Sequence, residues 1–226
     1  MSFNYSPKII NDSSLVLCLD AANNKSYPKS GTTWNDISKG ANTATLTNGP
    51  AFSSTNNGNI VFDGVDDFCS TTLVKTFTNM TIQVWFYKNG ASVSVYSGLV
   101  ASRGGAGGNI TGLLINGGGS ECLGYNWNDA VNTYSWNSGL VLRDNAWNFL
   151  SLTVTPTLAT GFLNGVSATN VVNHASTTIA NLAIGKDYST ERLVRGSIGL
   201  VFIYDKALST AEVTQNYNTT KIRYGL

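Results

Sequence analysis

The chain has 226 residues, and its fourteen Lys and Arg against thirteen Asp and Glu leave a net charge of +1. This length suits one large all-β domain or two small ones, and it can bury a core without disulfides or metals. Charged residues make up 12% of the chain, about half the share usual in globular proteins. No cluster of Lys or Arg stands out, so we expect no nucleic-acid partner, because that binding needs cations that displace counterions.

The N-terminal segment, "MSFNYSPKII", precedes the first strand-like run. We expect residues 1–13 to form an arm and residues 14–226 to form a single domain. The arm has two interpretations: it docks on a neighbouring subunit, or it packs back on its own domain. It lacks the basic region and long apolar run of a secretory signal, and no stretch of the chain approaches the ~20 apolar residues of a membrane span. We therefore expect neither secretion nor a membrane partner. Its candidate attachment residues are Phe3, Tyr5, Ile9 and Ile10.

Short apolar runs recur along the chain and are separated by Gly, Asn, Ser and Thr. In residues 80–88 and 147–155 the apolar residues alternate with period two, which is the pattern of a half-buried strand. Asn164-Gly165 predicts a tight type I′ hairpin within 159–169. About eleven such runs predict one antiparallel β-sandwich. The runs are 14–20, 59–64, 68–74, 80–88, 98–103, 110–116, 122–127, 147–155, 159–169, 181–185 and 195–205.

Three cysteines, Cys18, Cys69 and Cys122, lie far apart, each within an apolar run. An odd number at this spacing predicts buried free thiols rather than a disulfide framework. Free thiols in turn indicate synthesis in a reducing cytoplasm.

The segment "FDGVDDF" (62–68) places three carboxylates within five positions. Gly64 permits a positive φ, and Asp63 and Asp66 can accept hydrogen bonds from nearby backbone N–H groups, as in Asx turns. This favours a turn between two strands. The alternative is a calcium site, because Ca²⁺ takes six to eight oxygen ligands, often carboxylates. Asp63, Asp66 and Asp67 are therefore candidate metal ligands, and calcium is the candidate ion, although we expect no cofactor.

The stretch 125–136, "YNWNDAVNTYSW", interleaves aromatic and amide side chains. Sugar-binding sites combine aromatic walls with a few fixed polar groups, so a glycan platform is one interpretation. The other is that the alternating aromatics belong to the core. The candidate glycan-binding residues are Tyr125, Trp127, Asn128, Asp129, Tyr134 and Trp136.

The C-terminal stretch "LSTAEVTQNYN" (208–218) predicts a short helix. Ser209 suits the N-cap and Glu212 lies three positions later, which makes a capping box. Leu208 and Val213 are placed for a hydrophobic staple, and Tyr217 continues the apolar stripe.

Four segments in this order resemble the laminin-G-like, or concanavalin A-like, lectin/glucanase superfamily, in the form common in bacteriophage structural proteins. They are "LVLCLDAANNKSYPKSGTTWND", "IVFDGVDDF" with "MTIQVWFYK", "LGYNWNDAVNTYSWNSGLVLRDNAWNFLSLTV" with "GFLNGV", and "LAIGKD" with "RGSIGLVFIYDKALSTAEVTQNYN". The resemblance implies an all-β jelly-roll sandwich with one C-terminal helix. Lectins, hydrolases, adhesion modules and virion proteins share this fold, so function does not follow from it.

No residue pattern indicates catalysis. Retaining glycosidases need two carboxyl groups about 5 Å apart, whereas the three glutamates, Glu121, Glu191 and Glu212, are scattered along the chain. The single histidine, His174, has no obvious catalytic partner, and we expect it on the surface.

We therefore expect a non-enzymatic protein of a bacteriophage virion, a capsid decoration or appendage subunit. It would be assembled in the host cytoplasm, with other virion proteins as partners and as a homo-oligomer or bound to a lattice. The alternative is a carbohydrate-binding module or adhesin that recognises surface glycans.

Overall fold

Two packed antiparallel sheets form the body of the protein in a computed structural model that describes residues 8–90, 95–103, 108–116, 121–187 and 192–226. One sheet has eight strands in the order β14-β13-β12-β8-β17-β5-β4, with β1 also paired to β17. Their bounds are β1 (Leu15–Asp20), β4 (Ala51–Ser53), β5 (Asn59–Asp63), β8 (Met80–Lys88), β12 (Ala146–Val154), β13 (Ala159–Leu163), β14 (Val166–Asn170) and β17 (Arg195–Tyr204).

The second sheet has seven strands in the order β11-β10-β9-β16-β6-β3-β2. Their bounds are β2 (Thr33–Asn35), β3 (Thr43–Thr47), β6 (Phe68–Thr71), β9 (Ser97–Arg103), β10 (Ile110–Asn116), β11 (Cys122–Trp127) and β16 (Leu182–Ile184). The two remaining strands, β7 (Lys75–Phe77) and β15 (Thr177–Ile179), pair with each other in a small third sheet. The short helices are η1 (Thr55–Asn57), α1 (Val131–Tyr134), α2 (Thr210–Thr220) and η2 (Lys221–Tyr224). In the described residues, no helix has the length and apolar character needed to cross a membrane.

Alternating side chains of the eight-stranded sheet fill two separate cores. Ile82 of β8 lies opposite Leu152 of β12, and both face the main core between the sheets. Trp85 of β8 lies opposite Phe149 of β12, and both face the other side, where α2 covers the sheet. The period-two pattern of these two segments is therefore confirmed, and so is the predicted all-β sandwich with a C-terminal helix.

The predicted hairpin and the predicted state of the cysteines are also confirmed. Asn164 and Gly165 have φ values of 51° and 90°, as a type I′ turn requires, and they join β13 to β14. Cys18, Cys69 and Cys122 are all buried and free. Burial raises the pKa of the Cys18 thiol to about 12, with Asp20 and Asp36 adding to the effect, so this thiol is neutral at physiological pH.

Helix α2 begins with the predicted capping box. The Ser209 hydroxyl accepts a hydrogen bond from the Glu212 N–H at 3.3 Å, and the Glu212 carboxylate accepts one from the Ser209 N–H at 2.8 Å. Leu208 and Val213 are both buried in the second core, as the predicted staple requires. The helix is thus fixed at its first turn over the outer face of the eight-stranded sheet.

Ser209→Ala is expected to lower the free energy of unfolding by about 1 kcal/mol, because it removes the side-chain acceptor for the Glu212 N–H. Chemical denaturation of the variant and the wild type measures the difference. Ser209→Asn, which restores a capping oxygen, serves as the control. Equal stability of the alanine variant and the wild type would contradict the role of this cap.

Residues 8–10 of the N-terminal arm pack on their own domain. Ile9 and Ile10 contact the second core. The Ile10 N–H donates to the side chain of the buried Asn216 at 2.7 Å, and the Tyr204 hydroxyl donates to the Ile10 carbonyl at 2.9 Å. The expectation that these two isoleucines are attachment contacts is therefore corrected: intramolecular packing uses them. The other two candidates, Phe3 and Tyr5, lie outside the described residues.

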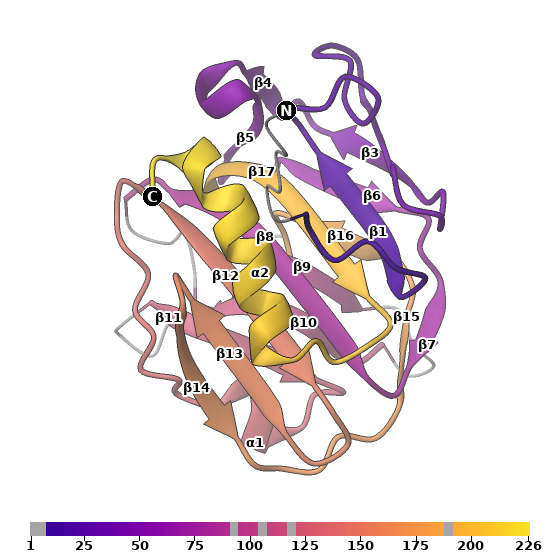
Figure 1. Ribbon diagram of the computed structural model, residues 1–226, viewed down its shortest axis with the longest axis vertical. Helices are drawn as coiled ribbons and strands as arrows, with labels where there is room; N and C mark the ends of the chain where they lie inside the picture. Colours follow the sequence, from indigo (N-terminus) through magenta and orange to yellow (C-terminus); the bar gives the residue numbers. More distant parts are fainter. Residues whose placement is uncertain (1–7, 91–94, 104–107, 117–120, 188–191) are drawn as a thin grey trace, which may run out of the picture.

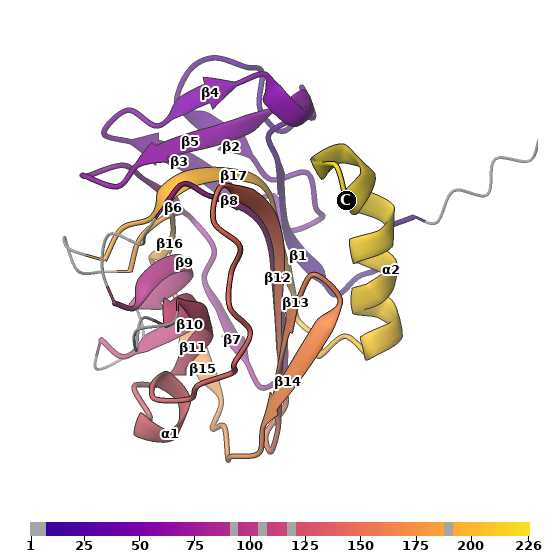
Figure 2. The same ribbon diagram turned by 90° about the vertical axis from the view of Figure 1, so that its left-hand side faces the viewer.

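The two sheets differ in what lies on their outer faces. Helix α2 and η2 cover the outer face of the eight-stranded sheet (Figure 1, Figure 2), where Trp85 stacks on Tyr224 at 4.2 Å between ring centroids. Within the described chain, no helix lies across the outer face of the seven-stranded sheet; α1 lies beside its edge strand β11 (Figure 2).

Candidate functional site

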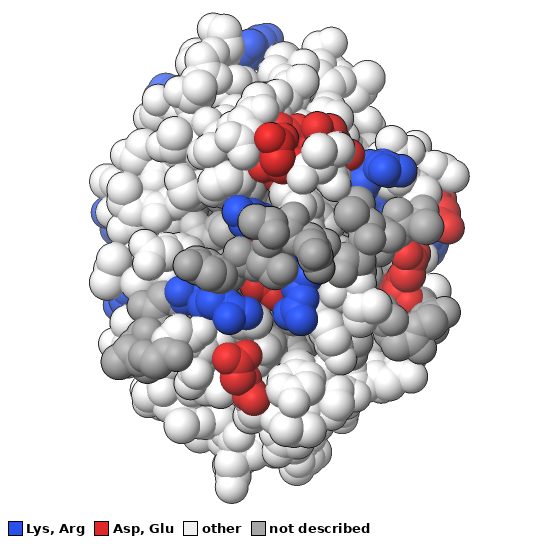
Figure 3. Space-filling view, turned by 180° about the vertical axis from the view of Figure 1, so that it is seen from behind, with Lys and Arg blue, Asp and Glu red and all other residues white. Residues whose placement is uncertain are grey.

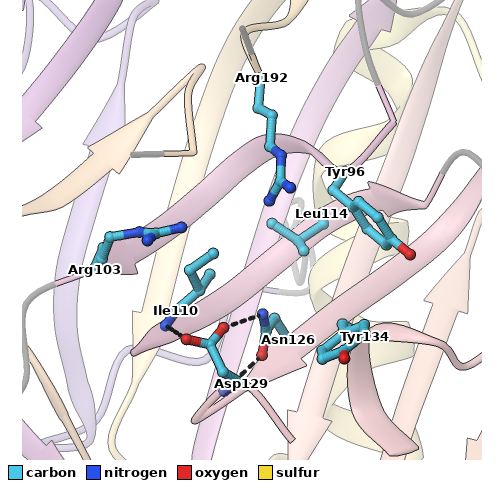
Figure 4. A pocket seen from close by; sticks show the side chains of 8 residues that line it. All are labelled: Tyr96, Arg103, Ile110, Leu114, Asn126, Asp129, Tyr134 and Arg192. Carbon is cyan, nitrogen blue, oxygen red and sulfur yellow. Dashed lines mark hydrogen bonds between the residues drawn. The ribbon is translucent and has the colours of Figure 1, made fainter. Parts of the chain in front are cut away.

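A pocket of about 330 Å³ lies on the outer face of the seven-stranded sheet (Figure 4). Strands β9, β10 and β11 supply its floor, α1 supplies one side, and the segments that precede β9 and β17 supply the rim. Its lining residues are Tyr96, Arg103, Ile110, Leu114, Asn126, Asp129, Tyr134 and Arg192.

The strand period decides which residues of β10 and β11 reach this pocket. Leu113 of β10 and Tyr125 of β11 lie opposite each other and face the main core. The next residues along these strands, Leu114 and Asn126, therefore point to the outer face, and both line the pocket. Asn126 thus contributes an amide beside the apolar side chains of Ile110 and Leu114.

Two of the six candidate glycan-binding residues belong instead to the core. Tyr125 and Trp127 are each only 1% exposed. The Trp127 indole N–H donates to the Ala175 carbonyl at 2.6 Å, and the Asn170 side chain donates to the Tyr125 hydroxyl at 2.9 Å. Burial raises the pKa of Tyr125 to about 12, although the Asn170 bond opposes this. The prediction that these rings form a glycan platform is wrong, because their position in β11 turns them inward.

The other four candidates divide between packing and the pocket. Trp136 packs edge-on against Tyr125, with ring centroids 5.6 Å apart, and contacts the main core. The Asn128 side-chain carbonyl accepts a hydrogen bond from the Thr177 hydroxyl at 2.7 Å, which joins the end of β11 to β15. Asp129 and Tyr134 line the pocket. The sequence stretch thus contained part of the site, but with the wrong aromatic residues at its centre.

Asp129 and Asn126 form a fixed polar pair in the pocket. The Asp129 carboxylate accepts hydrogen bonds from the Ile110 N–H at 3.1 Å and from the Asn126 amide at 2.8 Å. The Asp129 N–H in turn donates to the Asn126 carbonyl oxygen at 3.0 Å. Asn128 and Asp129 both have positive φ, 56° and 55°, so the chain turns sharply after β11 and brings the carboxylate back over β10. These polar groups are positioned before any ligand arrives.

Two arginines line the opposite side of the pocket, and a buried aspartate lies against them. Asp187 is fully buried, and its carboxylate accepts a hydrogen bond from Arg192 at 2.9 Å. The Arg103 guanidinium lies 4.0 Å from the other carboxylate oxygen. Figure 4 shows both arginine side chains pointing toward the middle of the pocket. Arg192 also lies 5.3 Å from the ring of Tyr96, which holds it from the other side.

A second hollow of about 590 Å³ adjoins the pocket on the same face, and Arg103 lines both. It is lined by Phe68, Ser70, Thr71, Ala101, Arg103, Asn181, Ala183 and Lys186. The Lys186 ammonium lies 4.1 Å from the centroid of the Phe68 ring. Figure 3 shows Lys and Arg side chains gathered near the middle of the molecule on this side.

Sequence reasoning missed Arg103, Arg192 and Tyr96. Arg103 had a usable signal, because it lies two positions after Ala101 in β9 and so shares its outer face. Arg192 and Tyr96 lie outside any regular element, where no period indicates which way a side chain points.

The three aspartates of 62–68 form the predicted turn. The Asp63 carboxylate accepts hydrogen bonds from the Val65 N–H at 2.7 Å and from the Asp66 N–H at 3.4 Å. Asp67, rather than Asp66, closes the turn by accepting from the Asp63 N–H at 3.0 Å. One carboxylate oxygen from each aspartate lies within 4.8 Å of the others. Calcium binding here stays the untested alternative to the turn, and the hydrogen bonds account for the geometry without an ion.

The expected surface position of His174 is wrong. The side chain is only 4% exposed, and a hydrogen bond of 2.9 Å joins its Nε2 to the Tyr125 hydroxyl. Desolvation lowers the pKa of this histidine, although a backbone hydrogen bond to Thr155 opposes the shift. His174 also packs edge-on against Trp127, so it belongs to the packing beneath the end of the sheet.

The protein belongs to the concanavalin A-like lectin/glucanase superfamily, whose family model matches residues 62–214. No curated protein sequence matches the chain. Among solved structures, it is similar to domain 4 of AbnA, an extracellular GH43 arabinanase from Geobacillus stearothermophilus in complex with arabinotriose. That match has 16% identity and a TM-score of 0.68, and it covers 90% of this chain and 98% of the other.

Two further similar structures belong to longer chains. One is Trypanosoma rangeli sialidase in complex with sialic acid, at 14% identity and a TM-score of 0.64, covering 94% of this chain and 34% of the sialidase. The other is the binding domain of Paraclostridial Mosquitocidal Protein 1, at 13% identity and a TM-score of 0.60, covering 91% of this chain and 52% of the other. At these identities the likeness shows the fold alone.

Proposed function

We propose that this domain binds a carbohydrate, without catalysis, in the pocket on the outer face of the seven-stranded sheet. The observation that carries the proposal is the half-buried ring of Tyr134 beside the fixed Asn126–Asp129 pair. A sugar presents apolar C–H groups to an aromatic ring and hydroxyl groups to positioned amides and carboxylates. The AbnA domain of similar fold, in complex with arabinotriose, supports the same class of ligand.

The described glutamates support a non-catalytic role because other contacts occupy them. Glu121 forms an ion pair with the buried Lys88, which Asp144 also contacts. Desolvation alone would lower the pKa of Lys88, but the hydrogen bonds to Asp144 and Glu121 outweigh it and raise the pKa. Glu212 caps helix α2 and pairs with Lys206 at 2.5 Å. Neither carboxylate lines the pocket.

The role of a virion subunit stays a prediction from the sequence resemblance. Ile9 and Ile10, two of its candidate contacts, pack within the domain, and no observation in the fold favours that role over glycan binding. The two roles are compatible, since a glycan-binding sandwich can be carried on a particle.

Tyr134→Ala is expected to weaken glycan binding at least tenfold, about 1.4 kcal/mol, because it removes one of the two aromatic rings that line the pocket while the fold is retained. A glycan array of the wild-type domain identifies a ligand, and calorimetry then compares the variants. Val131→Ala is the matched control, because Val131 lies on the same short helix, is 64% exposed and does not line the pocket. Unchanged affinity in Tyr134→Ala, or absence of any glycan ligand, would overturn the proposal.

A further inference from the structure

We infer that the ligand is a linear oligosaccharide that binds along its length, across strands β11, β10, β9, β16 and β6, rather than through one terminal sugar. This inference rests on the proposed glycan binding and specifies its substrate class. It starts from the second hollow, of about 590 Å³, which adjoins the pocket on the same face and which a single sugar bound in the pocket does not reach.

A row of mostly small side chains joins the floor of the pocket to the floor of the second hollow. Gly112 of β10 lies opposite Asn126 of β11 on one side and opposite Ala101 of β9 on the other. Ala183 of β16 lies opposite Ala101 and also opposite Ser70 of β6. Directly opposite residues share a face of the sheet, so the whole row points outward with Asn126. At about 4.8 Å between strands, the row spans about 19 Å, which is too long for one sugar ring.

Larger side chains lie on both sides of this row, two positions away along the same strands. Leu114 and Phe68 form one side, and Ile110, Arg103 and Asn181 form the other; each of them lines the pocket or the second hollow. A low floor between raised sides makes a groove that runs across the strands. Arg103 lines both hollows and lies where they meet. Because Ala101 is only 3% exposed, a chain that crosses this junction contacts the Arg103 side chain rather than the floor.

The second hollow also has the chemistry of a sugar site. In the described part of the chain, the Ser70 hydroxyl and the Asn181 amide have no hydrogen-bond partner, and both line the hollow. The half-buried Phe68 lies beside them, with the Lys186 ammonium 4.1 Å from its ring centroid. The ring and the lysine stem together form an apolar wall. An apolar wall with a few polar groups suits a sugar, as does the pocket at the other end of the groove.

The direct test measures affinity against chain length by calorimetry. The probes are cello-, xylo-, chito-, arabino- and galacturonic acid oligosaccharides of one to six units. Glycans that end in branched or sialylated terminal sugars form a second set. We expect at least one linear series to bind, with the hexasaccharide at least tenfold tighter than the disaccharide, because only the longer chain contacts both hollows.

Ala183→Leu fills the floor of the second hollow and should reduce the affinity of the hexasaccharide to that of the disaccharide. The affinity of the disaccharide, bound in the pocket, should not change. Ser167→Leu is the matched control, because Ser167 is an exposed strand residue in β14 of the other sheet, and it should bind both probes as the wild type does. Tyr134→Ala should weaken both probes. Circular dichroism confirms that each variant is folded.

The outcomes separate this inference from the function on which it rests. Equal affinities of the disaccharide and the hexasaccharide, or an unchanged hexasaccharide affinity in Ala183→Leu, would overturn binding along the groove and leave glycan binding intact. Binding restricted to the terminal sugars of the second set would do the same. Absence of any glycan ligand would overturn both.

Discussion

Trp127→Ala is expected to lower the free energy of unfolding by about 3–5 kcal/mol, the range for truncating a buried tryptophan. The indole is 1% exposed and packs among the residues of the main core. Its N–H donates to the Ala175 carbonyl at 2.6 Å, so the substitution also removes a hydrogen bond that ties residues 174–176 to the sheet. The expected loss of stability therefore comes both from a cavity in the core and from a buried carbonyl left without its hydrogen-bond donor.

Chemical denaturation followed by far-ultraviolet circular dichroism measures this effect. Trp127→Phe is the matched control, since it keeps most of the buried ring and loses only the hydrogen bond, and its cost should be clearly smaller. If Trp127→Ala is as stable as the wild type but binds the glycan more weakly, the Trp127 ring belongs to the binding surface. That result would contradict its place in the core.

Gly98→Ala is expected to destabilise the fold by about 1–3 kcal/mol, as overpacking does, and to abolish ligand binding. A Cβ atom at Gly98 would lie 2.2 Å from the Asp187 nitrogen and 2.4 Å from the Lys186 carbonyl carbon. Both are backbone atoms, so the segment that carries Asp187 must move away from β9. The Gly98 N–H also donates to the Arg192 carbonyl at 3.1 Å. Displacement of this segment therefore disturbs Asp187 and Arg192 together.

Gly139→Ala provides the comparison. A Cβ atom at Gly139 would meet nothing within 4 Å. The residue has a positive φ of 68°, so the substitution is expected to lower the free energy of unfolding only through backbone strain, by about 1–2 kcal/mol. Binding should survive in this variant. If Gly98→Ala binds the glycan as tightly as the wild type, the close packing of residues 186–187 against β9 is not what positions Arg103 and Arg192.

The fold was largely predictable because its strands are strongly periodic. The alternation in residues 80–88 follows from a strand that faces one core on each side, with Ile82 toward one and Trp85 toward the other. The capping box of Ser209 and Glu212 and the turn at Asn164-Gly165 are local signals that the tertiary structure left intact. The failed expectation for His174 has a tertiary cause, since its burial depends on Trp127 and Tyr125 of a distant strand.

The candidate site was predictable only in part. Composition pointed to residues 125–136, but composition does not distinguish the two faces of a strand. The actual register turns Tyr125 and Trp127 inward and Asn126 outward. The arginine side of the pocket unites Arg103 and Arg192, which are far apart in the sequence, through the buried Asp187. These residues come together because β9 pairs with β16, and no local sequence pattern predicts that pairing.

The central claim is that a glycan binds on the outer face of the seven-stranded sheet. A titration of the ¹⁵N-labelled domain with the array hit, followed by two-dimensional NMR, tests it most directly. We predict saturable shifts of the backbone amides that border the pocket, those of Ile110, Leu114, Asn126 and Asp129. Saturable shifts confined to another surface, such as the turn from Asp63 to Asp67, with these four amides unmoved, would contradict the account.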